Sequence, residues 1–222
     1  MGRIAFIGGT GPEGMGLALR CALAGESVII GSRQQARAEA AAEKERYRLH
    51  LLRPGAHIEG CENAAAADRA EIVAMCVPFA GLEHTLHELR PQLAGKIILD
   101  VVNPLQVRHG VFKLEPVPAG SVGELTQQMV PQAHVVSAFK NLSAEELLHL
   151  HHPLAGDVIL CGDHDQSKQQ IVDLVHRMPN LRPIDAGSLV NSRRLESITA
   201  LLLNLNRRYH AITSIQIIGL KI

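Results

Sequence analysis

The stretch Arg3-Ile4-Ala5-Phe6-Ile7-Gly8-Gly9-Thr10-Gly11-Pro12-Glu13-Gly14-Met15-Gly16 decides the fold of this chain. A short apolar run predicts a buried strand, and it ends in a cluster of glycines at which a helical pattern starts. Gly9, Gly11 and Gly14 have the spacing G-x-G-x-x-G, and a second apolar run, Ser27 to Ile30, follows at the distance of a βαβ unit. Without side chains the turn lets a pyrophosphate approach the backbone, where the positive end of a helix faces it. The stretch therefore predicts a dinucleotide site, although such turns also serve as tight connections alone.

The end of the second predicted strand indicates which dinucleotide binds. Sites for NAD place an acidic residue there, because a carboxylate accepts hydrogen bonds from the ribose hydroxyls. This chain has Gly31-Ser32-Arg33 instead, and Arg37 follows on a helix that we expect to start near Gln34. A hydroxyl and two guanidinium groups suit a 2′-phosphate, which an aspartate would repel. We therefore predict that NADP(H) is the cofactor and that Ser32, Arg33 and Arg37 hold its phosphate.

The composition limits the class of protein. Of the 222 residues, 46% are hydrophobic but only 3% are aromatic, which predicts an aliphatic core of one medium domain, with or without a small appendage. The 22 basic and 22 acidic residues balance, so nothing points to nucleic acid or an anionic membrane as a partner. The four cysteines are far apart and lack C-x-x-C spacing, and the first strand follows Met1 directly, which argues against a signal peptide. We expect a cytoplasmic protein with reduced thiols.

Strand and helix patterns alternate along most of the chain. This alternation predicts an α/β fold, a Rossmann-like doubly wound parallel sheet, over residues 1–187. Residues 105–120 are less regular, and Ser121 with Glu124 predicts a capping box. From Ser192 to about His210 apolar residues recur at helical spacing, so we expect residues 188–222 to form a small C-terminal helical unit that makes a cleft with the sheet domain. Because this tail is so apolar, we also expect a homodimer.

Candidate catalytic and metal-ligating groups are scarce. The densest histidine cluster, His149-Leu150-His151-His152, lies where we expect a solvated loop, and no Cys or carboxylate is spaced to complete a zinc site. No nucleophile and base form a convincing pair. We therefore predict no metal and no catalytic side chain. Hydride transfer between two rings needs stacking about 3–3.5 Å apart rather than an acid or base at the moment of transfer.

Several blocks of the sequence resemble the NADPH-dependent reductases of the deazaflavin coenzyme F420. The matching blocks are spread over the whole chain, and the segment from Leu181 to Arg193 is more specific than the glycines. The blocks are Ile7–Gly11, Gly31–Arg33, Val135–Ala138, Val158–Asp163 and Leu181–Arg193, continuing through Glu196-Ser197 and Leu203-Asn204.

The resemblance implies a homodimer that transfers hydride between NADPH and coenzyme F420 as second substrate. It implies a pyrophosphate surrounded by the turn that contains Gly9, that is by Thr10, Gly11, Pro12 and Glu13. It also implies that two further places border the cofactor: the end of the strand predicted at residues 71–77, and the residue that follows the strand predicted at residues 135–137. These residues are Cys76, Val77, Pro78 and Ala138.

Two stretches depart from the archaeal form of the family, and both are expected near the second substrate. They are Phe139-Lys140-Asn141, where a histidine is expected near Lys140, and Val102-Asn103-Pro104-Leu105. In place of the histidine, Lys140 would pair with an anionic ring or phosphate of the acceptor. Two alternatives stay open: an NADPH-dependent reductase of an ordinary flavin or another small acceptor, as in the cytosolic domains of membrane metalloreductases, and a Rossmann protein that senses NADP without turnover.

Overall fold

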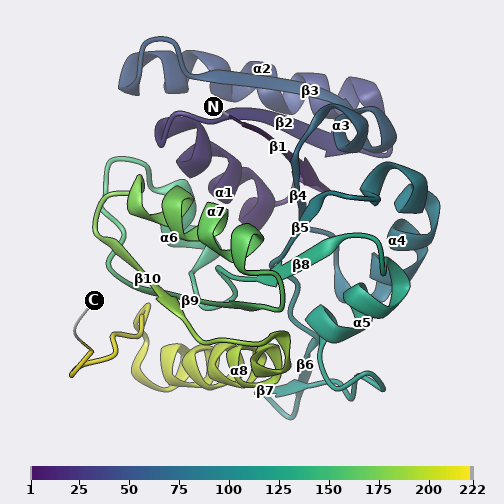
Figure 1. Cartoon of the computed structure of the whole chain (residues 1–222). Helices are drawn as coiled ribbons and strands as arrows, with labels where there is room; N and C mark the ends of the chain where they lie inside the picture. Colours follow the sequence, from purple (N-terminus) through teal and green to yellow (C-terminus); the bar gives the residue numbers. More distant parts are fainter. Residues whose placement is uncertain (1, 221–222) are drawn as a thin grey trace.

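The computed structural model describes residues 2–220. Its main sheet has eight strands in the order β10-β9-β8-β5-β4-β1-β2-β3 (Figure 1). They are β1 Arg3–Ile7, β2 Ser27–Ser32, β3 His57–Glu62, β4 Ile72–Met75, β5 Ile97–Asp100, β8 His134–Ser137, β9 Gly156–Gly162 and β10 Leu181–Asp185.

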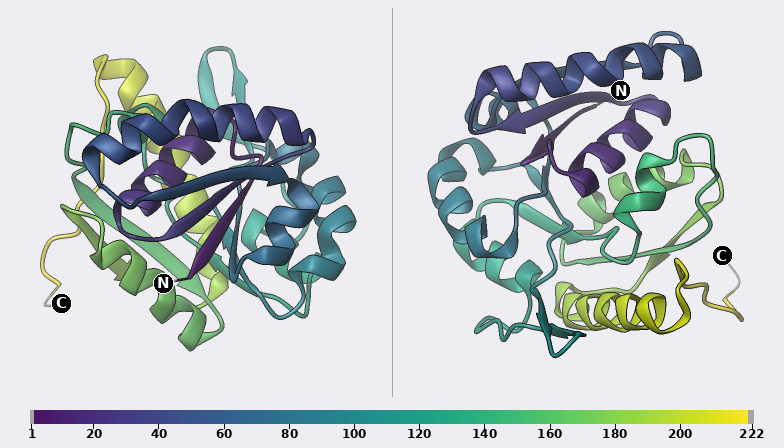
Figure 2. Two further views of the ribbon diagram at one scale, coloured as in Figure 1. Left: turned by 90° about the horizontal axis from the view of Figure 1, so that it is seen from above. Right: turned by 180° about the vertical axis from the view of Figure 1, so that it is seen from behind.

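Helices cover both faces of this sheet, as three views show (Figures 1 and 2). On one face α1 Pro12–Leu23, α2 Gln35–Leu52, α6 Ala144–Leu148 and α7 Asp165–His176 pack over a cluster that includes Phe6, Ile30 and Leu160. On the other face lie α3 Asn63–Arg69, α4 Phe79–Leu93 and α5 Val122–Met129. The core is aliphatic, because consecutive strand residues point to opposite faces and both faces are buried.

One strand pair runs against the predicted direction. Every neighbouring pair in the sheet is parallel except β8 and β9, which are antiparallel over the short register Val136↔Gly162 and Ser137↔Cys161. A parallel neighbour needs a crossover to the other end of the strand, whereas β9 begins beyond the carboxyl end of β8 and runs back beside it. The predicted Rossmann-like doubly wound parallel sheet is confirmed, with β8 and β9 as its one antiparallel pair.

The irregular region predicted at residues 105–120 contains a β-hairpin. Its strands are β6 Leu105–Arg108 and β7 Val111–Leu114, and the turn residues His109 and Gly110 have φ of 51° and 75°. Positive φ at both central positions matches the twist of a tight hairpin. The hairpin lies against the C-terminal helix, where the Asn204 side chain bonds both backbone groups of Phe112, at 2.9 Å each.

Residues 189–217 pack against β9 and β10. A short 3₁₀ helix, η1 Leu189–Asn191, leads into α8 Ser192–Tyr209, whose Leu195 joins a cluster with Ile159 and Ile184. The following segment has no regular structure and is fixed by the buried Asp157, which accepts from the Ile217 N–H at 2.6 Å and from Arg182 at 2.8 Å. Among residues 2–220 we find no helix that combines the length and the apolar character needed to cross a membrane.

Two sets of side-chain contacts orient helices of the sheet domain. The predicted capping box is confirmed, since the Glu124 N–H donates to Ser121 Oγ at 3.2 Å and that hydroxyl donates to the Glu124 carboxylate at 2.7 Å. Arg20, in the last turn of α1, donates to four backbone carbonyl oxygens in and just after α6. The base of α1 is thereby joined to residues 146–152.

Candidate active site

The glycine-rich turn between β1 and α1 is shaped by backbone contacts that exclude side chains. The Gly9 N–H donates to Phe6 O at 2.9 Å, and a Cβ added at Gly9 would lie 2.6 Å from the same oxygen. Gly11 is the N-cap of α1, and no side chain caps its N-terminus. The first N–H groups of α1 therefore stay available for an anion at the positive end of the helix dipole.

This turn opens on a cavity of about 620 Å³ at the carboxyl edge of the sheet. Ten of the twelve residues predicted to hold the cofactor line it: Thr10, Gly11, Pro12, Glu13, Ser32, Arg33, Arg37, Cys76, Val77 and Pro78. Gly9 and Ala138 are buried beneath the surface and do not line it. Gly9 supports the turn from behind, and Ala138 lies in the apolar core.

The two arginines at the end of β2 face solvent without a partner. Arg33 and Arg37 are exposed, and neither guanidinium forms an ion pair or hydrogen bond with a described residue. Ser32 is buried, and its Oγ accepts from the Gln34 N–H at 3.3 Å, which fixes the start of α2. Two unpaired cations beside a hydroxyl at this end of the cavity fit a phosphate monoester.

The ends of β4 and β5 form the opposite end of the cavity. Gly14 contacts this wall closely, since a Cβ there would lie 2.9 Å from Cys76 Cβ. Burial raises the pKa of the Cys76 thiol well above its usual value, so this thiol stays protonated. Val101 and Val102, just after β5, complete an apolar surface on this side.

Glu13 is the acidic residue of the cavity wall. It stands in the first turn of α1, its side chain is half-buried, and no described residue hydrogen-bonds or ion-pairs to it. Burial raises its pKa to about 7, while Lys140 lowers and Asp100 raises that value to smaller extents. Glu13 is therefore a carboxyl that gains and loses a proton near neutral pH.

The expectation that Lys140 pairs with the acceptor is wrong. Its side chain is fully buried, with Nζ 2.8 Å from Asp100 Oδ2 and 3.4 Å from Glu196 Oε1, and it donates to the Val102 carbonyl oxygen. Burial raises the pKa of Glu196 above its usual value, and Lys140 opposes that shift. The ammonium group of Lys140 is thus bound entirely by groups of the protein, and it holds the backbone at Val102 behind the cavity wall.

Two asparagines lie on the cavity wall; Asn103 belongs to a stretch expected near the second substrate, whereas Asn63 was not predicted as a site residue. Asn63 opens α3 and Asn103 follows β5, and in each the side-chain Oδ1 is buried without a hydrogen-bond donor. The Asn103 Nδ2 donates to Lys140 O at 3.2 Å, which fixes the orientation of that amide. Asn103-Pro104 at a strand end is visible in the sequence as a break after an apolar run. The position of Asn63 could not be read from the sequence, because it depends on packing between β2 and α3.

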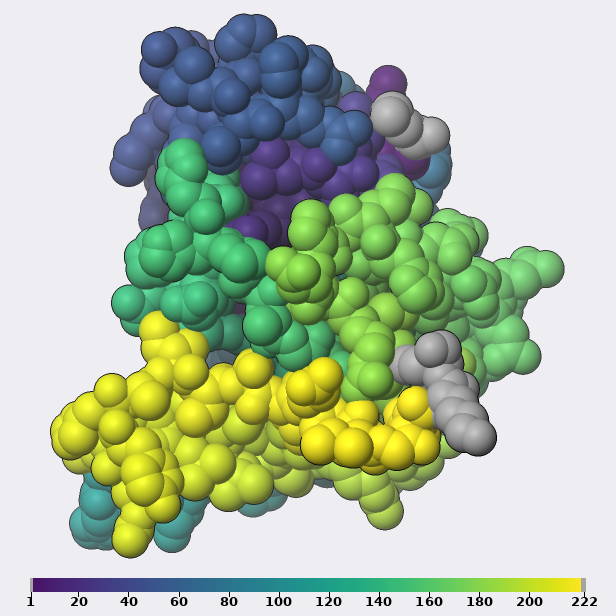
Figure 3. All heavy atoms as spheres, turned by 90° about the vertical axis from the view of Figure 1, so that its left-hand side faces the viewer, coloured from purple at the N-terminus to yellow at the C-terminus, as the bar shows by residue number. Residues whose placement is uncertain are grey.

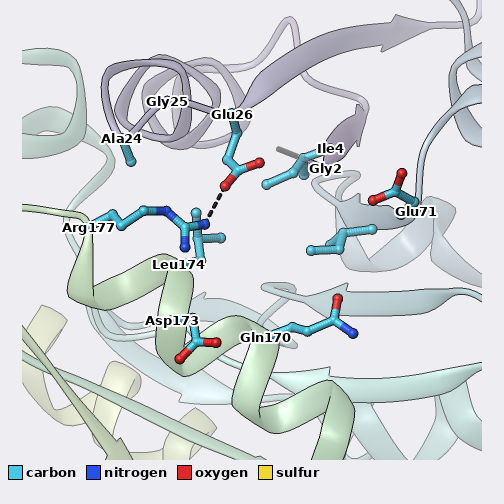
Figure 4. A pocket seen from close by; sticks show the side chains of 11 residues that line it. Gly2, Ile4, Ala24, Gly25, Glu26, Glu71, Gln170, Asp173, Leu174 and Arg177 are labelled. Atoms are coloured by element: carbon cyan, nitrogen blue, oxygen red, sulfur yellow. Dashed lines mark hydrogen bonds and ion pairs between the residues drawn. The ribbon is translucent and has the colours of Figure 1, made fainter.

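A second cavity, of about 340 Å³, lies at the opposite edge of the sheet. Figure 4 shows its acidic side chains Glu26, Glu71 and Asp173, with Glu26 paired to Arg177. Its lining does not include the glycine-rich turn between β1 and α1. Within the described residues no group of three His, Cys, Asp or Glu side chains is arranged to hold a metal ion, and the His84 side chain pairs instead with Glu88 at 3.2 Å.

The fold and the larger cavity define a Rossmann-type oxidoreductase whose site fits a dinucleotide with a 2′-phosphate. The family described as NADP oxidoreductase coenzyme F420-dependent matches residues 3–104. The chain is 38% identical to the F420-dependent NADP reductase of Methanocaldococcus jannaschii, over 99% of this chain and 100% of that protein. The chain belongs to the family of F420-dependent NADP reductases, so the resemblance inferred from the sequence is confirmed.

Of two further comparisons, one supports the fold, and the other concerns the metalloreductases named above as an alternative. The crystal structure of a putative F420-dependent NADP reductase from Arthrobacter sp. FB24 superposes with a TM-score of 0.80 at 26% identity, covering 99% of this chain and 100% of that one. The Metalloreductase STEAP3 of Rattus norvegicus is 30% identical over 88% of this chain, which corresponds to only 36% of that protein.

Proposed function

We propose that this protein transfers a hydride between NADPH and the deazaflavin coenzyme F420. The observation that carries the proposal is the single cavity that joins the uncapped N-terminus of α1 to the unpaired Arg33 and Arg37, in a chain that aligns over its full length with reductases of this type. The nicotinamide cofactor supplies the hydride when bound, and the protein supplies position and exclusion of water.

Each part of the wall has one task in this proposal. Backbone N–H groups of the turn hold the pyrophosphate, and Ser32, Arg33 and Arg37 hold the 2′-phosphate. The ends of β4 and β5, with Cys76 and Val102, border the nicotinamide, because open α/β sheets bind ligands outside the carboxyl ends of their strands. The acceptor ring stacks on the nicotinamide, and no side chain has to attack either ring.

Absorbance assays on the purified protein test the proposal. NADPH oxidation is followed with oxidised coenzyme F420 and, under identical conditions, with FMN or FAD. We expect rapid turnover with the deazaflavin. Turnover with the ordinary flavin alone would contradict the proposal in favour of a flavin reductase, and tight NADPH binding without turnover would favour a sensor.

We also propose that the protein is a homodimer of the cytoplasm that binds no nucleic acid. Several apolar side chains are exposed on and beside the C-terminal helix, which forms the base of the face shown in Figure 3. They are Val107, Val111, Leu201, Tyr209 and Ile212. Exposed apolar patches of this kind mark association surfaces. Light scattering should give twice the monomer mass for the wild type and the monomer mass for Leu201→Glu.

A further inference from the structure

Reduction of the acceptor consumes a proton as well as a hydride, and this inference rests on the proposed function. NADPH, the oxidised acceptor and one proton give NADP⁺ and the dihydro acceptor. Stacked rings exclude bulk water from the reacting face. A titratable group on the cavity wall is suited to pass the proton to the acceptor and to recover it from solvent afterwards.

Few groups on the cavity wall can carry this proton. Guanidinium groups do not act as proton donors in proteins, which excludes Arg33 and Arg37. The Cys76 thiol is held protonated by burial, and His84 is mostly exposed at the rim, paired with Glu88. The remaining titratable group of the described lining is Glu13.

The position of Glu13 suits this role. It lies in the first turn of α1, next to Gly14, whose backbone contacts Cys76 at the end of β4. This is the half of the cavity where the nicotinamide, and hence the stacked acceptor, is expected. The carboxyl has no hydrogen-bond partner among the described residues, so it is free to donate to a ligand.

Two charged groups behind Glu13 shift its pKa in opposite directions. Lys140 favours the carboxylate, and Asp100 opposes it. Because Lys140 is itself bound to Asp100 and Glu196, its charge is largely compensated. Burial dominates, and the pKa of Glu13 rises to about 7. A carboxyl in this range loses and recovers its proton at neutral pH without a large driving force.

We propose that Glu13 is the proton donor to the acceptor ring during its reduction, and the base that removes the same proton in the reverse reaction. The O–H bond of the Glu13 carboxyl breaks as an N–H bond forms on the acceptor ring. The carboxylate that remains takes a proton from water after the product has left. NADPH is oxidised and the acceptor is reduced, and the protein itself returns to its starting state.

Single-turnover kinetics of NADPH with coenzyme F420 test this role in the wild type, Glu13→Gln and Glu13→Asp. Loss of a general acid slows such steps by about 10²-fold or more, so we expect that reduction in Glu13→Gln. We also expect Glu13→Gln to lose the pH dependence centred near 7. Glu13→Asp should recover part of the rate and part of the pH dependence. Glu83→Gln, which changes an exposed carboxyl on α4 outside the cavity, should match the wild type.

A measurement without turnover separates this proposal from the proposed function. Calorimetry of NADP⁺ binding near pH 7, in two buffers of different ionisation enthalpy, should show a proton exchange in the wild type and in Glu83→Gln that differs in Glu13→Gln, because the charges of the ligand change the protonation of Glu13. Unchanged rates, pH profile and proton exchange in Glu13→Gln would overturn the role of Glu13 and leave the proposed function intact. Failure of the wild type to bind NADP⁺ would overturn the proposed function itself.

Discussion

Arg33 and Arg37 on the cavity wall and Lys140 behind it are cations that differ in what faces them. Arg33 and Arg37 lie at the end of β2, exposed and without a partner among the described residues. Lys140 lies behind the wall at the end of β5, fully buried and bound to Asp100 and Glu196. The two exposed arginines can still bind an anion, whereas the charge of the buried Lys140 is already compensated by two carboxylates. A cation near a site is thus informative only when its partners are known.

The largest expected effect comes from removing the buried cation. Lys140→Met would leave Asp100 and Glu196 as uncompensated buried carboxyls, which costs about 3–5 kcal/mol of folding free energy. Urea unfolding should show this loss. The double variant Lys140→Met with Asp100→Asn should recover part of it, since one of the stranded charges is gone. A midpoint within error of the wild type would mean that the cluster does not stabilise the fold.

Removing the exposed cations should affect binding rather than folding. We expect Arg33→Ala and Arg37→Ala each to weaken NADPH binding by about 10- to 100-fold, because a hydrogen bond to a charged group contributes about 1.5–3 kcal/mol. Affinity for NADH, which lacks the 2′-phosphate, should change little. Fluorescence titration with both nucleotides measures the ratio. Equal losses for the two nucleotides would place the arginines elsewhere than at the phosphate.

Salt should distinguish the exposed arginines from the buried Lys140. Raising the ionic strength from about 0.05 M to about 0.5 M shortens the screening length several-fold, so NADPH affinity should fall several-fold. The cost of Lys140→Met in urea unfolding should not change over the same range, because the cluster is buried. A salt-sensitive cost would indicate that water reaches Lys140.

The smallest effect is expected for a cation that is both exposed and paired. Arg193 on α8 makes two hydrogen bonds to the Glu124 carboxylate, of 2.8 and 2.6 Å, and these bonds lower the pKa of Glu124. Exposed pairs contribute about 0–1 kcal/mol, so Arg193→Met should cost at most this amount in urea unfolding. Because the pKa of Glu124 is lower in the folded protein, this contribution exists at neutral pH and disappears as the pH falls through that lowered value. A cost that persists below it would have another origin.

The sequence predicted features that depend on local structure. The glycine turn and Ser32 with the two arginines line one cavity, and the capping box at Ser121 forms; each is set within a few residues of chain. The partners of Lys140 could not be predicted, because Asp100 and Glu196 are distant in sequence and meet only through sheet order and the packing of α8. The direction of β9 escaped prediction for a similar reason, since side-chain periodicity is the same in parallel and antiparallel strands. The hairpin at residues 105–114 carried only a His109-Gly110 turn as its signal.

Arg20 has a mechanical consequence for ligand entry. Its side chain joins the last turn of α1 to four carbonyl oxygens between residues 146 and 152. The helix whose N-terminus faces the cavity is therefore clamped at its far end and cannot tilt without breaking several hydrogen bonds. We expect the opposite wall, formed by the start of α4 and the approach to the β6–β7 hairpin, to supply whatever closing movement traps the two rings together.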